Sequence, residues 1–296
     1  MTLADGPLDM FVSREEMRFD FGGARFRLPR DRDALAWIFS QFLYGEVTGI
    51  QCGHWLYRAP DLEAATFFAH QSVEEMGHVR HFVRLLDRLG ERARPVHRAV
   101  RFLSTSFMGA SFEEHVCLEM AAGEGFVLMV LYALIDTIDD PDIVRVLEAA
   151  TPQEERHVAF GERRTKRAVA DDPALARHLL GLSLVSLATV RWLARRVPRF
   201  VAHDHEVVRQ LPAFLEKTCE VAELRLRRMG VATRPLAEIG WARRATLAGI
   251  GCARHLVKAA LPSGRRLTDT YLDDPLVGGT SENGEGHPLQ SGSRPL

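Results

Sequence analysis

Long segments rich in apolar residues make up most of the chain, and short stretches with proline, glycine or aspartate separate them. This pattern predicts a series of α-helices. Two helix starts are marked clearly: Asp61 follows Pro60 as a cap, and Asp140 stands as N-cap before Pro141 at the first helical position. The expected helices cover residues 33–57, 62–89, 111–137, 142–170, 174–200 and 204–229, with a shorter one at 235–260.

These helices predict an all-α protein in four parts. Residues 1–32 form an N-terminal arm, with either a short strand or an irregular segment near 24–28, and residues 33–170 form an antiparallel four-helix bundle. The connector at 91–110 is the long crossover that joins two hairpins in one bundle. Residues 171–262 form a C-terminal helical extension. The tail at 263–296 contains Gly, Ser and Pro with few apolar residues, which predicts disorder.

Composition adds limits to this picture. With 296 residues, 46% hydrophobic and 26% charged, the chain resembles ordinary soluble globular proteins. A net charge of −1 gives no reason to expect nucleic acid as a partner, and arginine clusters on helices are typical of solvated faces. The four cysteines lack zinc-like spacing, which favours a reducing, cytoplasmic location.

No targeting or membrane segment is expected. The first residues lack the basic region and apolar run of a signal peptide. The longest uncharged segment near the middle, at 179–190, has 12 residues, which is too short to span a bilayer.

The most informative feature is a pattern of glutamate and histidine that occurs twice. Each copy has one glutamate, a turn, and then a Glu-x-x-His motif on the next helix. The separation between the two glutamates is 29 residues in the first copy and 30 in the second. The six residues are Glu46, Glu75 and His78 in the first copy, and Glu124, Glu154 and His157 in the second.

Helical geometry gives the spacing a reason. Positions three apart share a helix face, so the Glu and His of each Glu-x-x-His motif can bind one metal ion. In each copy the lone glutamate lies 14 or 15 residues before the turn, and the glutamate of the Glu-x-x-His motif lies 14 residues after it. This equal spacing puts the lone glutamate level with its Glu-x-x-His across the hairpin. Four Glu and two His from four helices are what a pair of iron or manganese ions needs inside a bundle.

Two alternatives stay open. With 22 Glu and 12 His, roughly one Glu-x-x-His pair is expected by chance, so a surface coincidence is conceivable, although two copies at matched spacing are harder to explain. Glu119 competes with Glu124, but its distance from the turn differs by six residues, or ~9 Å of helix. Glu74 and Glu155 are rotated about 100° from the motif positions, towards solvent or the outer contacts of the site.

The arrangement resembles the ferritin-like diiron-carboxylate superfamily over residues 33–170. The segment from His157 to Glu162 is loosely similar to the fourth-helix region of aldehyde-deformylating oxygenases. Aryl-amine N-oxygenases of this superfamily carry a further histidine four residues before the last motif glutamate, where this chain has Ala150. Ferritins are shorter chains without the extension beyond residue 172, and the tRNA-hydroxylating members are roughly similar in motif.

The resemblance implies a ferritin-like bundle that holds two Fe ions, or Mn or a mixed pair, with O2 as co-substrate. It implies Glu75 and Glu154 as bridging carboxylates and catalytic groups. Glu46 with His78 would complete one metal, and Glu124 with His157 the other. The absence of thiolate ligands disfavours a structural zinc or iron–sulfur site.

The function expected from these residues is a non-haem diiron oxygenase or oxidase acting on a small apolar organic molecule. It would need an electron donor such as a ferredoxin or reductase, and helical extensions of this kind often form homodimers. A ferroxidase or a tRNA-nucleoside hydroxylase is the alternative. Four small residues near the site leave room for a substrate or simply allow close helix packing: Gly49, Ala121, Ala122 and Gly125.

Overall fold

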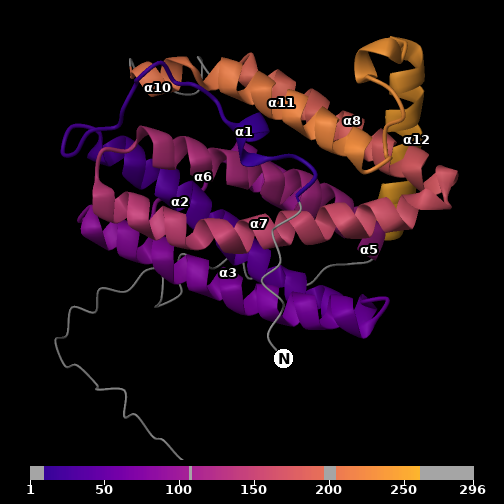
Figure 1. Cartoon of the computed structure of the whole chain (residues 1–296), viewed down its shortest axis with the longest axis horizontal. Helices are drawn as coiled ribbons and strands as arrows, with labels where there is room; N and C mark the ends of the chain where they lie inside the picture. Colours follow the sequence, from indigo (N-terminus) through magenta and orange to yellow (C-terminus); the bar gives the residue numbers. More distant parts are fainter. Residues whose placement is uncertain (1–9, 107–108, 197–204, 261–296) are drawn as a thin grey trace, which may run out of the picture.

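The computed structural model describes residues 10–106, 109–196 and 205–260, and this part of the chain is all-α (Figure 1). In chain order, its elements are α1 (Arg14–Met17), α2 (Arg32–Gly49), the 3₁₀-helix η1 (Ile50–Arg58), α3 (Leu62–Arg88), α4 (Arg98–Ser106), α5 (Phe112–Glu114), the π-helix η2 (His115–Glu124), α6 (Gly125–Thr137), α7 (Pro141–Ala170), α8 (Pro173–Ala194), α10 (Glu206–Arg209), α11 (Leu211–Arg228), the 3₁₀-helix η3 (Leu236–Glu238) and α12 (Trp241–Ala259).

The two expected N-caps are confirmed. The Asp61 carboxylate accepts a hydrogen bond from the backbone N–H of Ala64 (2.8 Å), and α3 begins there. The Asp140 carboxylate accepts from the backbone N–H of Ile143 (3.0 Å), with Pro141 opening α7. Both contacts satisfy amide groups that a helix start would otherwise leave unpaired.

Two helical hairpins pack side by side. The first is α2 with α3, and the second is η2 and α6 with α7; α3 also contacts α7, which joins the hairpins (Figure 1). Between them lies a core of fully buried residues, among them Phe39 and Leu43 of α2, Phe82 of α3 and Leu128 of α6. Burial of these faces holds the helices that carry the glutamates and histidines at matching height.

Two of the four predicted bundle helices are interrupted. The helix expected at 33–57 continues beyond Gly49 as a 3₁₀-helix, and the one expected at 111–137 passes through the π-helix His115–Glu124. A π-helix is wider than an α-helix and turns later residues to a different angle, which periodicity alone does not reveal. Glu124 lies at the end of this π-helix.

The C-terminal helices form a second layer over the hairpins. A separate apolar cluster, with Leu179 of α8 and Cys219 and Leu226 of α11, fills this layer. The predicted helix at 174–200 ends at Ala194, the one at 204–229 is divided into α10 and α11, and the one at 235–260 is η3 followed by α12. The tail predicted to be disordered, 263–296, lies outside the described residues.

The arm and the connector differ from expectation. In place of a strand at 24–28, Phe26 forms an isolated bridge with Ile138: its N–H donates to the Thr137 carbonyl (2.7 Å) and its carbonyl accepts from the N–H of Asp139 (3.1 Å). The partner segment is only the short turn between α6 and α7, so no longer ladder can form. The connector at 91–110 contains the helix α4.

Two helical segments of the described residues are long and apolar enough to cross a membrane by length and composition, Phe112–Thr137 and Pro173–Ala194. This is a weak indication, because core helices of soluble proteins have the same character. The first segment carries Glu114, which is fully buried within the protein.

Candidate metal centre

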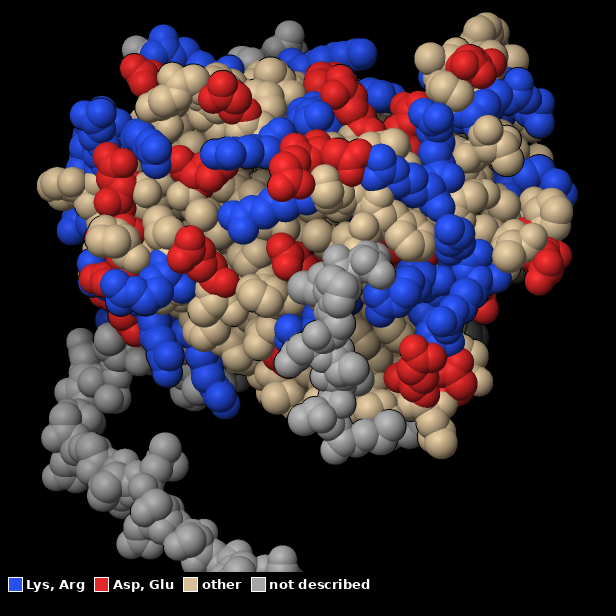
Figure 2. Space-filling model, viewed as in Figure 1, with Lys and Arg blue, Asp and Glu red and all other residues tan. Residues whose placement is uncertain are grey.

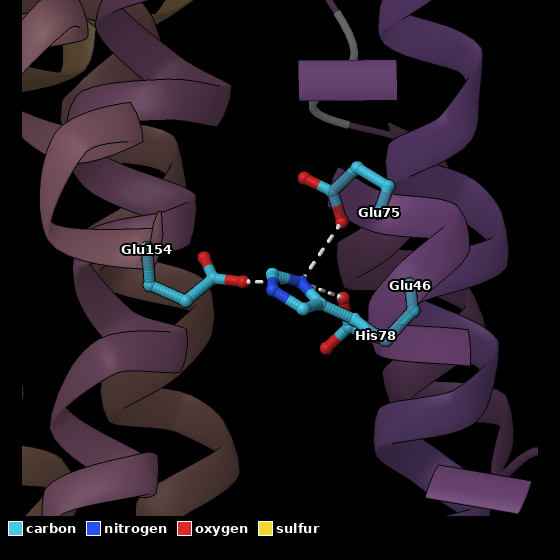
Figure 3. Close-up of side chains that lie close together, drawn as sticks. All are labelled: Glu46, Glu75, His78 and Glu154. Atoms are coloured by element: carbon cyan, nitrogen blue, oxygen red, sulfur yellow. Dashed lines mark hydrogen bonds and ion pairs between the residues drawn. The ribbon is translucent and has the colours of Figure 1, made fainter. Parts of the chain in front are cut away.

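Three of the predicted glutamates surround the imidazole of His78 (Figure 3). Its Nδ1 lies 3.2 Å from Oε2 of Glu46 on α2 and 3.7 Å from Oε2 of Glu75 on its own helix. The same nitrogen lies 2.9 Å from Oε1 of Glu154 on α7. Three helices therefore bring three carboxylates to one nitrogen.

A second cluster surrounds His157 on α7. Its Nδ1 lies 3.4 Å from Oε1 of Glu75 and 3.7 Å from Oε2 of Glu124. Oε2 of Glu154, one turn earlier on the same helix, lies 3.8 Å away. Both clusters thus contain Glu75 and Glu154, and the structure brings all six predicted residues together.

The two shared carboxylates face the histidines in opposite directions. Glu75 turns Oε2 to His78 and Oε1 to His157, while Glu154 turns Oε1 to His78 and Oε2 to His157. The two outer carboxylates each face one histidine: Glu46 faces His78, and Glu124 faces His157. One metal ion could therefore bind His78 and Glu46, and a second could bind His157 and Glu124. Glu75 and Glu154 could serve both ions.

Charge and burial make this cluster costly without cations. Burial raises the pKa of Glu46 to about 8, although hydrogen bonding to His78 opposes the shift. Burial likewise raises the pKa of Glu124 well above its ordinary value. Burial disfavours the charged form of His78 as well, but the nearby carboxylates of Glu154, Glu46 and Glu75 outweigh it and raise the pKa of this imidazole. In the absence of metal, bound protons therefore reduce the repulsion among these buried carboxylates. Divalent ions could neutralise the same negative charge instead.

Unpaired atoms support the fit of a metal at the second cluster. Nδ1 of His157 and Oε2 of Glu124 are buried and make no hydrogen bond, although buried polar atoms are nearly always paired. They face each other at 3.7 Å. An ion between them would satisfy both, so the side chains present fit a bound metal.

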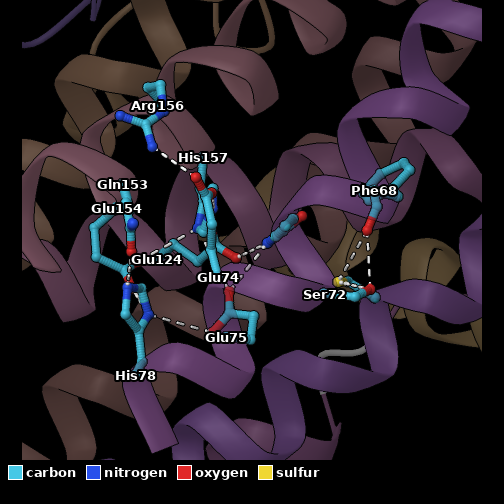
Figure 4. A network of polar contacts seen from close by, with 12 residues as sticks. Phe68, Ser72, Glu74, Glu75, His78, Glu124, Gln153, Glu154, Arg156 and His157 are labelled. Carbon is cyan, nitrogen blue, oxygen red and sulfur yellow. Dashed lines mark hydrogen bonds and ion pairs between the residues drawn. The ribbon is translucent and has the colours of Figure 1, made fainter. Parts of the chain in front are cut away.

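Further residues hold the histidines from outside (Figure 4). Nε2 of His78 donates to Oε1 of Gln153 (2.7 Å), and Nε2 of His157 lies 2.8 Å from Oε2 of Glu74, whose other oxygen binds Arg156 (2.6 Å). These contacts hold Nε2 of each ring outward and turn Nδ1 to the shared carboxylates, so a metal ion could replace the Nδ1 proton there. Glu74 therefore belongs to the outer contacts.

Sequence reasoning did not single out Gln153 or Gln71, which both touch the cluster. Gln71 donates to Oε1 of Glu124 (2.7 Å) and to Oε1 of Glu75 (3.3 Å), one turn further along α3. The i,i+4 spacing to Glu75 was a usable signal for Gln71. Gln153 adjoins Glu154 in sequence, and only the helix packing shows that it reaches His78.

The competing glutamate has a different partner. Oε2 of Glu119 lies 2.7 Å from Nδ1 of His115, one turn earlier in the π-helix. Glu124 is the residue that lies beside His157. Glu155 is also occupied elsewhere, since it accepts a hydrogen bond from the Tyr132 hydroxyl (2.6 Å).

The small residues near the site both allow close packing and line open space. A Cβ atom on Gly49 would lie 2.7 Å from Oε2 of Glu75, and one on Gly125 would meet the guanidinium of Arg225. Gly49, Ala122 and Gly125 also line a cavity of about 670 Å³. Ala121, by contrast, is fully buried and packs against Gly161 of α7.

This cavity reaches the carboxylates. Glu46, Glu75, Glu124 and Glu154 all form part of its wall. Most of the remaining wall is apolar, and it includes Phe42, Leu118, Phe126, Val127, Val130, Leu187, Val190 and Phe214. A volume of this size falls in the range of small-molecule sites.

No protein-family model, no curated protein and no solved structure matches this chain.

Proposed function

We propose that this protein is a non-haem diiron oxygenase or oxidase, built on a ferritin-like antiparallel four-helix bundle, that uses dioxygen to oxidise a small apolar organic substrate. One observation carries the proposal: Glu75 and Glu154 each offer one oxygen to His78 and the other to His157. Ordinary buried ion pairs do not require this two-sided arrangement, whereas a pair of adjacent metal ions does.

The donor set determines which metal suits the site. Glu46 and His78 would hold one ion, Glu124 and His157 the other, with Glu75 and Glu154 bridging. Carboxylate and imidazole donors suit iron or manganese. A bound pair of reduced irons would supply electrons to dioxygen, and an external donor such as a ferredoxin or reductase would replace them.

Neighbouring side chains would hold the ligands of this site in place. Gln153 and Glu74 hold the two imidazoles in the orientation and protonation state that binding requires. Gln71 holds two of the carboxylates through its amide. These contacts restrict the conformations of the ligand side chains before a metal binds. A preorganised site of this kind binds metal more tightly than one whose side chains are free to move.

The cavity supports an apolar organic substrate. It places apolar side chains beside the carboxylates, and neither Gln153 nor Glu74 forms part of its wall. Burial of an apolar molecule there is favourable, and exclusion of water protects an oxidation from side reactions. A wall of this kind is a poor route for iron ions, which is why we place a ferroxidase second.

Metal content tests the proposal. We expect about two irons per chain after expression in iron-supplemented medium, and almost none in the Glu75→Ala/Glu154→Ala double variant. The matched control is Glu119→Ala/Glu155→Ala, which removes two nearby carboxylates with other partners and should keep its iron. Reduced wild-type protein should then consume oxygen faster with an apolar substrate present.

Absence of metal from the wild type after anaerobic reconstitution would contradict the proposal. So would equal iron content in the double variant and the wild type.

A further inference from the structure

One face of α12 is occupied by the rest of the protein. Gly251 of α12 approaches Gly181 of α8 closely: a Cβ atom on Gly181 would lie 2.3 Å from the carbonyl oxygen of Leu247. One turn further, Nδ1 of His255 lies 2.8 Å from Oε2 of the buried Glu114. This packing fixes the orientation of α12, which stands at the edge of the molecule in Figure 1.

The other side of α12 is exposed and apolar. Its large side chains have high exposed fractions: Trp241 78%, Ile250 50%, Leu256 66% and Val257 80%. Four of the eleven large exposed hydrophobic residues in the described part of the chain lie on this one helix of 19 residues. Such a concentration marks an interaction surface, because single exposed apolar residues scatter at random.

The charge of α12 has one sign. Residues 241–259 contain no Asp or Glu, and Arg243 and Arg254 are exposed. At about 100° per residue, Arg243, Ile250, Arg254 and Val257 fall within about 60° of one another around the helix axis. Over most of the view in Figure 2, in contrast to this helix, basic and acidic side chains are interspersed.

We propose that the exposed side of α12 docks on an anionic lipid bilayer, with the helix lying in the plane of the interface. Apolar side chains next to arginine, with tryptophan at one end, are typical of helices that insert one face between headgroups. The arginines would bind the anionic headgroups, and Ile250, Leu256 and Val257 would leave water. This inference does not depend on the metal site.

Other occupants fit less well. A second copy of the same face would bring together two surfaces that both carry only positive charge, which repel. Nucleic acid would use the arginines but would leave the apolar side chains exposed. A spanning orientation is excluded for α12 alone, since its opposite face is packed on α8.

Vesicle flotation with the full chain tests the docking. We expect binding to vesicles of phosphatidylglycerol and phosphatidylcholine and little binding to phosphatidylcholine alone, with weaker binding at high salt because surface charges are screened. Arg243→Gln/Arg254→Gln should weaken binding about 25-fold, from about fivefold per basic residue. Ile250→Ser/Val257→Ser should weaken it about tenfold or more.

Matched controls lie elsewhere on the surface. Val73→Ser changes a β-branched residue of α3 with an exposed fraction of 64%, and Arg145→Gln changes an exposed arginine of α7; both should bind like the wild type. Unchanged circular dichroism and melting would show that the α12 variants fold. Equal binding to neutral and anionic vesicles, or equal binding by all variants, would overturn the proposal. So would dimerisation in solution that the Ile250→Ser/Val257→Ser variant abolishes while vesicles are not bound.

Discussion

At the scale of single residues, the site depends on which partner each charged group finds. Glu74 and Glu155 each adjoin a motif glutamate, yet Glu74 binds the ring of His157 and Glu155 binds the hydroxyl of Tyr132. The first contact sets the direction of a nitrogen that we propose binds metal, while the second links α6 and α7 away from it. Glu74 precedes its motif glutamate and Glu155 follows its own, and only the preceding position reaches a histidine.

This difference leads to a prediction for Glu74→Ala. Without its carboxylate acceptor, the imidazole of His157 loses its orientation and some basicity, so we expect metal affinity to fall about 10–100-fold. Titration against a competing chelator measures the change. Glu155→Ala is the matched control and should leave affinity within about twofold. Equal losses in both variants would show that Glu74 acts only through general stability.

At the scale of elements, the position of Glu124 depends on contact between α7 and the π-helix. Gly161 of α7 lies against the backbone of η2, where an added Cβ would be 2.7 Å from the amide nitrogen of Ala121 and from the carbonyl oxygen of Val116. Only a residue without a side chain permits this approach. The helix that carries Glu154 and His157 can therefore lie close to the one that carries Glu124.

We predict that Gly161→Ala destabilises the protein by about 1–3 kcal/mol, because the methyl group must push two helices apart. Gly77→Ala, on α3, is the control: an added Cβ there has no neighbour within 4 Å, and the better helix propensity of alanine should stabilise by up to about 1 kcal/mol. Urea unfolding followed by circular dichroism gives both values. The same sign of change in both variants would contradict the proposed packing role.

At the scale of the whole molecule, the buried cluster couples folding to protons. The folded state raises the pKa of Glu46 to about 8 through burial, and it raises the pKa of Glu124 and of both histidines. Each of these groups binds more protons in the folded state than in the unfolded state. Stability from these groups is therefore present at low pH and is lost as pH rises through the folded-state values.

For the metal-free protein, we predict that the melting temperature falls between pH 5.5 and 8. The shift of Glu46 alone, from 4.5 to about 8, covers this window, and a loss of order 2 kcal/mol, about 6 °C, is expected. Glu154 has a lowered pKa, because its interactions with the imidazoles of His157 and His78 outweigh burial, and so affects stability only at more acidic pH.

Calorimetry in the presence of a chelator measures the effect. Glu46→Gln should flatten the pH dependence, since the amide binds no proton, and bound metal should do the same by replacing protons. A melting temperature that rises from pH 5.5 to 8 in the metal-free wild type would refute the prediction.

Much of the all-α architecture could be predicted because helix signals are local. Asp61 and Asp140 cap helices through contacts within three residues, and the i,i+3 spacing puts Glu75 and His78 on one face. The strand at 24–28 was wrong, because a strand needs a partner segment and the turn at Ile138 supplies only one bridge. The π-helix was missed because composition does not distinguish it from an α-helix.

The sequence by itself determined which six side chains could meet, since equal spacing across two hairpins aligns them at one height. Tertiary structure alone decided which oxygen of Glu75 faces which histidine, that Gln153 and Glu74 hold the imidazoles, and that an apolar cavity ends at the carboxylates. The physical reason is distance along the chain. Gln153 and His78 are 75 residues apart, and such contacts depend on how close whole helices pack and how they rotate about their axes.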